Sequence, residues 1–121
     1  MAEESVFLVT EVWLLPGQFE LLKDYRKRTL DVLSPYRPEF VFHNHGFEWV
    51  SDDNEGSIPT GMEVLRFDNE ADARAAIADL STPELKAMER RVFSRVRSYF
   101  SRYAPSEGGR WARNRSKGQS I

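Results

Sequence analysis

The sequence contains no cysteine, which excludes disulfide bridges, thiolate zinc sites and thiol nucleophiles and fits a reducing cytosol. Histidine is almost as scarce, because only two of the 121 residues are histidine. The acidic residues 1–5 lack the basic and apolar segments of a secretory signal, and no apolar run approaches the length of a membrane span. We therefore expect a cytoplasmic protein with no membrane partner.

Neither sign of charge dominates, and the formal net charge is −2. No global field attracts nucleic acid, so we expect no nucleic-acid partner. The charge is nevertheless uneven, because residues 105–121 carry a net charge of +3 and the rest of the chain a net charge of −5. The charged residues of 105–121 are Arg110, Arg113, Arg115, Lys117 and Glu107. We interpret 105–121 as a basic C-terminal extension that is either flexible or lies on a partner.

The first half of the chain alternates between strand and helix patterns. Strand signals, dense in β-branched and aromatic residues, fall on three segments: 6–15, 40–50 and 62–67. Residues 51–61 are polar and predict a long hairpin loop. Residues 18–33 predict an amphipathic helix with the apolar stripe Leu22, Tyr25, Thr29, Val32 and Leu33. The charged residues of that helix are assigned mostly to its solvent side: Lys23, Arg26, Lys27 and Asp31.

Two helix starts follow in the second half. Asn69 is a candidate N-cap for a helix whose stripe is rich in small residues: Ala73, Ala76, Ile77 and Leu80. Thr82 is a candidate N-cap for a further helix, with Pro83 in its first turn. Residues 93–103 fit both a strand and an extension of that helix, but their aromatic content and Pro105 favour a strand near 96–103.

This element order predicts one α+β domain over residues 6–104, with a ferredoxin-like βαββαβ order and a four-stranded antiparallel sheet. Helices cover only one face of such a sheet. In the strands at 6–15 and 40–50, neither alternating set of side chains is plainly hydrophilic. A second apolar face needs a cover, and a second copy of the chain supplies one. We therefore predict a homodimer packed sheet against sheet.

Three segments resemble the dimeric α/β-barrel superfamily, which includes antibiotic-biosynthesis-monooxygenase-like, NIPSNAP-like and DUF1330-like domains. They are PGQF at 16–19 after the first strand, VLRFDNEADA at 64–73, and TPELKAM at 82–88. The resemblance implies a pocket between sheet and helices in each monomer and a barrel formed by two sheets. Known members include cofactor-free monooxygenases, isomerases, haem enzymes and proteins without known activity. The long loop at 51–60 and the basic tail depart from the compact family pattern.

His43 and His45 are the candidates for chemistry, because residues i and i+2 of a strand project to the same face. They could act as general acid or base, bind a metal together with Glu11 or Glu63, or simply be hydrogen-bonded strand residues. We predict no metal and no cofactor. Glu11, mid-strand among apolar residues, is a candidate electrostatic partner of the histidines. A structural ion pair is the favoured alternative, with one of Arg66, Arg95 or Arg97.

Aromatic side chains are the candidate walls of a pocket for a small hydrophobic ligand: Trp13, Phe47 and Trp49. Their more common role is in a core or a dimer interface. Tyr25 and Arg66 are further candidates for substrate binding. The sequence thus suggests a cofactor-independent monooxygenase or isomerase acting on a hydrophobic aromatic or polyketide-like substrate. The alternative is a non-catalytic ligand-binding or assembly protein.

Overall fold

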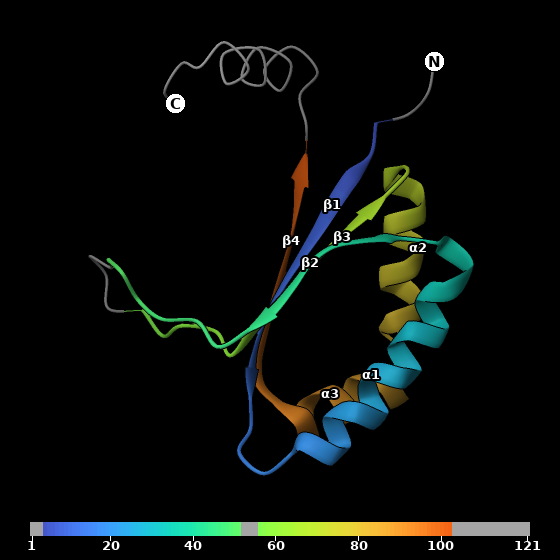
Figure 1. The fold of residues 1–121 in the computed structure, drawn as a ribbon. Helices are drawn as coiled ribbons and strands as arrows, with labels where there is room; N and C mark the ends of the chain where they lie inside the picture. The colour runs from blue at the N-terminus through green and yellow to red at the C-terminus, as the bar shows by residue number, and fades with distance from the viewer. Residues whose placement is uncertain (1–3, 52–55, 103–121) are drawn as a thin grey trace, which may run out of the picture.

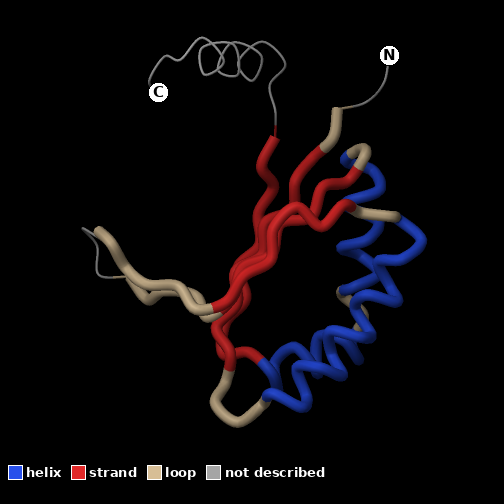
Figure 2. Tube along the Cα trace, in the orientation of Figure 1, coloured by secondary structure: helices blue, strands red, loops and turns tan. Residues whose placement is uncertain are grey.

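The computed structural model describes residues 4–51 and 56–102. Four strands form one antiparallel sheet in the order β2-β3-β1-β4, and the helices all cover the same face of it (Figures 1 and 2). The strands are β1 (Val6–Leu14), β2 (Glu39–His45), β3 (Gly61–Phe67) and β4 (Phe93–Arg102). The helices are α1 (Phe19–Leu33), the short 3-10 helix η1 (Ser34–Tyr36), α2 (Glu70–Leu80) and α3 (Pro83–Val92). The predicted α+β, ferredoxin-like arrangement is confirmed.

The ambiguous segment at 93–103 is a strand over its described part. Helix α3 ends at Val92, and Phe93 already has extended backbone angles. From there β4 pairs antiparallel with β1, from Leu14 opposite Phe93 to Val6 opposite Arg102. Pairing with the free edge of β1 therefore makes residues 93–102 a strand, a choice that the periodicity of the segment left open. The predicted domain end at 104 and the extension at 105–121 lie outside the described residues.

Strand β2 is shorter than the predicted 40–50 and ends at His45. Gly46 has a φ of 74°, a left-handed conformation that glycine adopts at little cost and that takes the chain out of the ladder. Residues 46–51 and 56–60 then leave the sheet together as an arm, which Figure 1 shows projecting away from the helices. Phe47 and Trp49 lie in this arm and not in a strand.

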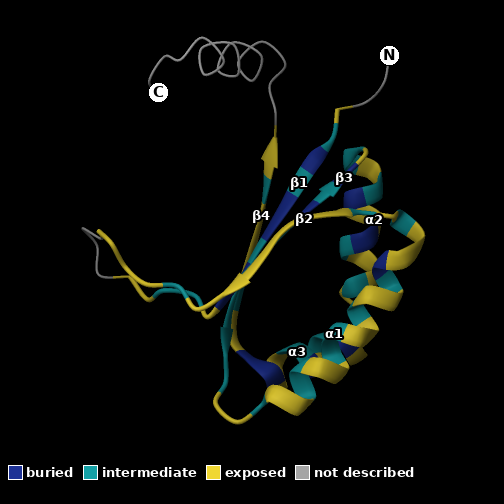
Figure 3. Ribbon diagram, in the orientation of Figure 1, coloured by how far each residue is buried: buried dark blue, intermediate teal, exposed yellow. Residues whose placement is uncertain are grey.

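The core lies between the sheet and the helices and includes Val6, Leu8, Leu33, Leu65, Phe67, Ala73 and Ala76. Figure 3 shows the buried residues on β1, β3 and the inner sides of the helices, whereas β2 is exposed throughout. Both predicted caps are confirmed: Asn69 Oδ1 accepts a hydrogen bond from the Asp72 amide at 2.8 Å, and Thr82 Oγ1 accepts one from the Leu85 amide at 3.3 Å. No helix in the described part of the chain is long and apolar enough to cross a membrane.

Helix α2 approaches the sheet closely because its inner residues are small, and Ala76 is fully buried there. We expect Ala76→Leu to lower the free energy of unfolding by about 1–3 kcal/mol, since the added carbons overpack this contact. Urea denaturation at a fixed protein concentration measures the effect. Ala78→Leu, the same change on the exposed side of α2, is the control and should stay within about 0.5 kcal/mol of wild type. Equal stability of the two variants would contradict the close approach of α2.

Candidate functional site

A cavity of about 300 Å³ lies between the sheet and the three α-helices, at the lower end of the range for small-molecule sites. All four strands contribute to its floor, and α1, α2 and α3 close it from the other side. Much of its wall is apolar and includes Leu8, Val12, Leu22, Leu65, Phe93 and Val96. The polar side chains gather in two groups, one at β2 and one at α3.

The first group, here called the histidine corner, consists of His43, His45, Arg26 and Glu63. The two histidines project from β2 to the same face, and their ring centroids lie 4.8 Å apart in an edge-to-face arrangement. Arg26 Nη1 of α1 lies 3.2 Å from Glu63 Oε2 of β3, and Arg26 Nη2 lies 3.3 Å from His43 Nδ1. Because β2 is the edge strand and both histidines are exposed, this corner lies at the open side of the cavity.

The contact with Arg26 determines the tautomer of His43. A guanidinium can only donate, so Nδ1 of His43 must accept, and the proton of a neutral ring then sits on Nε2. Partial burial lowers the pKa of His43 below its ordinary value of 6.5, and the charges of Arg26 and His45 lower it further, although Glu63 opposes them. His43 is therefore neutral at pH 7 and presents an N–H donor.

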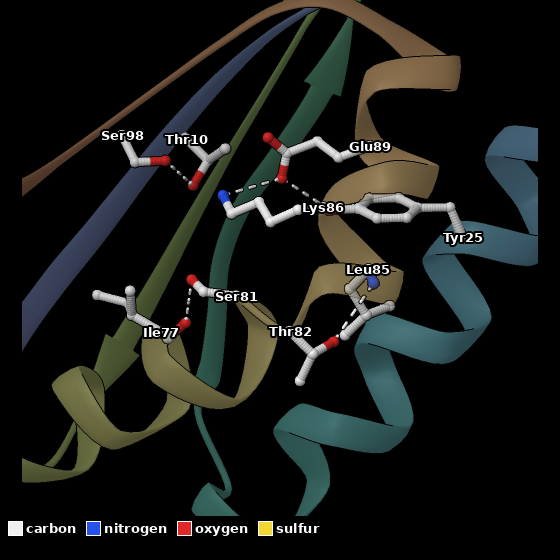
Figure 4. Close-up of polar contacts among 9 residues, drawn as sticks. All are labelled: Thr10, Tyr25, Ile77, Ser81, Thr82, Leu85, Lys86, Glu89 and Ser98. Atoms are coloured by element: carbon white, nitrogen blue, oxygen red, sulfur yellow. Dashed lines mark hydrogen bonds and ion pairs between the residues drawn. The ribbon is translucent and has the colours of Figure 1, made fainter.

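The second group, here called the glutamate corner, consists of Tyr25, Lys86 and Glu89 (Figure 4). The Tyr25 hydroxyl donates to Glu89 Oε2 at 3.2 Å, and Lys86 Nζ donates to the same oxygen at 3.4 Å. Burial and the neighbouring Glu89 raise the pKa of Tyr25 well above its usual value, so its phenol stays protonated. The hydroxyl groups of Thr10 and Ser98, 3.3 Å apart across β1 and β4, lie on the floor of the cavity.

Three of the predicted site residues line the cavity together, namely His43, His45 and Tyr25. Glu11 does not, and the predicted pairing of Glu11 with the histidines is not present. Glu11 projects to the opposite face of β1, where Arg97 Nη2 lies 2.9 Å from its carboxylate and the Tyr99 hydroxyl donates to it at 2.8 Å. The favoured alternative, a structural ion pair with an arginine, is what the structure contains.

The predicted aromatic walls also lie outside the cavity. Trp13 is on the same outer face as Glu11, with the Arg95 guanidinium 4.6 Å from its ring centroid. Trp49 is exposed in the arm, and Phe47 precedes it there. Arg66 Nε donates to Glu39 at 2.8 Å and is not a lining residue. The walls are mainly aliphatic instead, because the strand residues that face the helices are mostly Leu and Val.

The four charged lining residues were not predicted to line a ligand pocket: Arg26, Glu63, Lys86 and Glu89. Arg26 had been assigned to solvent and Glu63 considered only as a metal ligand. The available signal was helical spacing, because Arg26 follows Leu22 by four residues and precedes Thr29 by three. Across residues 4–51 and 56–102, no group of three or more histidine, aspartate or glutamate side chains is arranged to hold a metal ion.

The effect of Arg26 on His43 can be measured directly. We expect Arg26→Met to raise the pKa of His43 toward its ordinary value, because a nearby cation is removed while Glu63 and His45 remain. An NMR titration of the two histidines, assigned with the His45→Gln variant, measures the shift. Arg28→Met is the control, since Arg28 of the same helix pairs with Asp24 and Glu84. An unchanged His43 titration in Arg26→Met would refute the contact.

The same pKa shift has a consequence for stability. Because the folded state disfavours protonated His43, this residue destabilises the fold as pH falls below 6.5 and has no such effect above it. The decrease in the free energy of unfolding between pH 7 and lower pH should be smaller in Arg26→Met than in wild type.

No protein-family model and no curated protein sequence matches the chain. Solved structures do match it. A NIPSNAP-like domain protein from Burkholderia xenovorans has a TM-score of 0.55 at 11% identity, over 85% of this chain and 88% of that one. A protein of unknown function from Rhodopseudomonas palustris has a TM-score of 0.63 at 11% identity, over 84% of each chain. SnoaB, a cofactor-independent oxygenase from Streptomyces nogalater, has a TM-score of 0.54 at 14% identity, over 84% of this chain and 94% of that one. The predicted resemblance is thus confirmed at the level of the fold: the chain has the ferredoxin-like fold typical of dimeric α/β-barrel proteins.

Proposed function

We propose that this protein binds a small, largely apolar molecule in the cavity and moves a carbon-bound proton of that molecule at the histidine corner. A cofactor-independent monooxygenase or an isomerase acting on a hydrophobic aromatic or polyketide-like substrate needs this step. The observation that carries the proposal is the meeting of two histidines, an arginine and a glutamate at one side of a mainly apolar cavity. The fold is also that of a cofactor-independent oxygenase, but fold alone does not choose a function.

The two histidines have different roles in this proposal. Nδ1 of His43 is engaged by Arg26, so His43 offers its Nε2 proton to a ligand oxygen as a hydrogen-bond donor. The His45 side chain has no hydrogen bond among the described residues, so its ring nitrogens are available to a ligand, and we assign it as the general base. Tyr25 is a wall residue of the same site.

His45 takes the proton from a carbon next to a carbonyl group, and the electron pair of the broken C–H bond forms an enolate. The negative charge on the enolate oxygen faces the Nε2–H donor of His43, which Arg26 holds in this tautomer. In an isomerase the proton returns to a different carbon. In a monooxygenase molecular oxygen is the second substrate and the oxidant: one of its atoms becomes a carbonyl oxygen on the reacting CH₂ carbon, and the other leaves as water with the two hydrogens of that carbon.

The step can be tested with 2-tetralone, a fused-ring aromatic ketone, in D₂O. We expect the protein to accelerate deuterium incorporation next to the carbonyl, as followed by proton NMR. His45→Gln should lower the acceleration by about 10²-fold or more while the ketone still binds, because a general base contributes that much. His43→Leu should lower it as well, because leucine has no hydrogen-bond donor.

Arg28→Met, outside the cavity, is the control and should exchange as wild type does. Saturable binding without accelerated exchange in wild type would favour the alternative of a non-catalytic ligand-binding protein. Absence of any binding would contradict the ligand site itself.

We also propose that two copies of the chain pack through the outer face, the side of the sheet turned away from the helices. By strand register, Val9 lies beside Val64 and Tyr99 there, and Phe42 lies beside Val64. Phe42 and Tyr99 are exposed in the single chain although they are large and apolar or aromatic. A patch of this kind on a sheet is typical of an interface. An assembly role without catalysis would use the same face.

Phe42→Asp tests the dimer, because it places a charge on the outer face, at the edge strand β2. We expect wild type to be a dimer and Phe42→Asp a monomer at micromolar concentration, as measured by light scattering after size-exclusion chromatography. Phe19→Asp is the matched control, since Phe19 is also an exposed phenylalanine but lies at the start of α1. A wild-type monomer, or equal dissociation in both variants, would refute the sheet-to-sheet dimer.

A further inference from the structure

The charges in the cavity wall are compensated in pairs. Among the described lining residues, the two permanent cations are Arg26 and Lys86, and the two carboxylates are Glu63 and Glu89. Arg26 lies 3.2 Å from Glu63, and Lys86 lies 3.4 Å from Glu89. The permanent charges of the described wall residues therefore sum to zero, and each cation already has a carboxylate beside it.

The carboxylates of these pairs lie deeper than the cations. The side chains of Glu63 and Glu89 are 23% and 18% exposed, whereas those of Arg26 and Lys86 are 38% and 43% exposed. A ligand inside the cavity thus meets the negative member of each pair in the less hydrated position. Charges in such positions are screened less than charges that water reaches.

We propose that the cavity selects an uncharged ligand with hydrogen-bonding oxygen atoms and rejects carboxylates, and that Glu63 and Glu89 set this preference. The inference rests on the proposed function only in taking this cavity as the ligand site. A ligand carboxylate would lose its water and find no cation without a partner among the described lining residues, so its lost hydration is not compensated. A carbonyl or hydroxyl group loses far less on burial and can bond to polar groups such as Thr10, Ser98 and Ser81.

The Tyr25 hydroxyl shows how the cavity wall affects the ionisation of an acidic O–H group. Its hydroxyl lies against Glu89 at 3.2 Å, and burial together with the charges of Glu89 and Glu63 raises its pKa. The wall at this point therefore opposes an anion on a phenolic oxygen. A ligand carboxylate near the same carboxylates meets the same two penalties.

Two probes of nearly equal shape separate charge from fit, namely 2-acetylnaphthalene and 2-naphthoate. In calorimetric or fluorescence titrations at pH 7, we expect wild type to bind the ketone at least about tenfold more tightly than the carboxylate. Glu63→Gln leaves Arg26 without its carboxylate, so it should raise the affinity for 2-naphthoate relative to that for the ketone by about tenfold or more. Glu89→Gln, which frees Lys86, is a second and independent variant. Glu84→Gln is the control, because Glu84 pairs with Arg28 outside the cavity.

The outcomes separate the inference from the proposed function. Equal binding of the two probes by wild type overturns the charge selection and leaves the ligand site intact. Failure of both Glu63→Gln and Glu89→Gln to gain affinity for 2-naphthoate, with unchanged thermal unfolding, overturns the role of the two glutamates. Binding of neither probe by wild type contradicts the ligand site and, with it, this inference.

Discussion

The structure depends on the central strand β1, which pairs along both edges and alternates its side chains between two environments. Its even-numbered residues face the helices, where Val6 and Leu8 enter the core and Thr10 and Val12 form the floor of the cavity. Its odd-numbered residues form the middle of the outer face, where Glu11 is only 5% exposed because Arg97 and Tyr99 cover it. One strand thus serves both faces of the sheet, and within residues 4–51 and 56–102 helices cover only one of them. The cavity and the proposed dimer are consequences of the same alternation.

Local signals in the sequence were sufficient for most of the elements, but not for the end of β2 or for the choice between strand and helix at 93–102. The caps at Asn69 and Thr82 and the small residues of α2 were predicted because each depends on a few neighbouring residues. The faces of different strands could not be matched in the same way. Periodicity states which residues of one strand share a side, but not which side of β2 corresponds to which side of β1. That relation is set through β3 and by an irregularity between Phe40 and Phe42, where the register of β2 shifts. Glu11 was therefore placed with the histidines although it faces away from them.

The charged residues of the cavity were not predicted, because a general rule about helix surfaces assigns such residues to solvent. Charges beside the apolar stripe of a helix are usually solvated, and Arg26 and Lys86 keep part of their side chains in water. Their partners Glu63 and Glu89 come from different elements and are distant in sequence, so no local pattern links the two pairs into one wall. The half of the site that the sequence did predict, His43 and His45, lies within a single strand, where spacing alone brings side chains together.

The two polar corners of the cavity differ in what they offer to a ligand oxygen. At the histidine corner, the Nε2 proton of His43 is a donor to an oxygen that gains negative charge. At the glutamate corner, the protonated Tyr25 phenol shows that negative charge on an oxygen is opposed. In the proposed reaction, a ketone forms its enolate when its carbonyl lies at the histidine corner. The proposed selection against carboxylates admits such a ketone while its oxygen is uncharged, and the His43 donor stabilises the charge that forms there during the reaction.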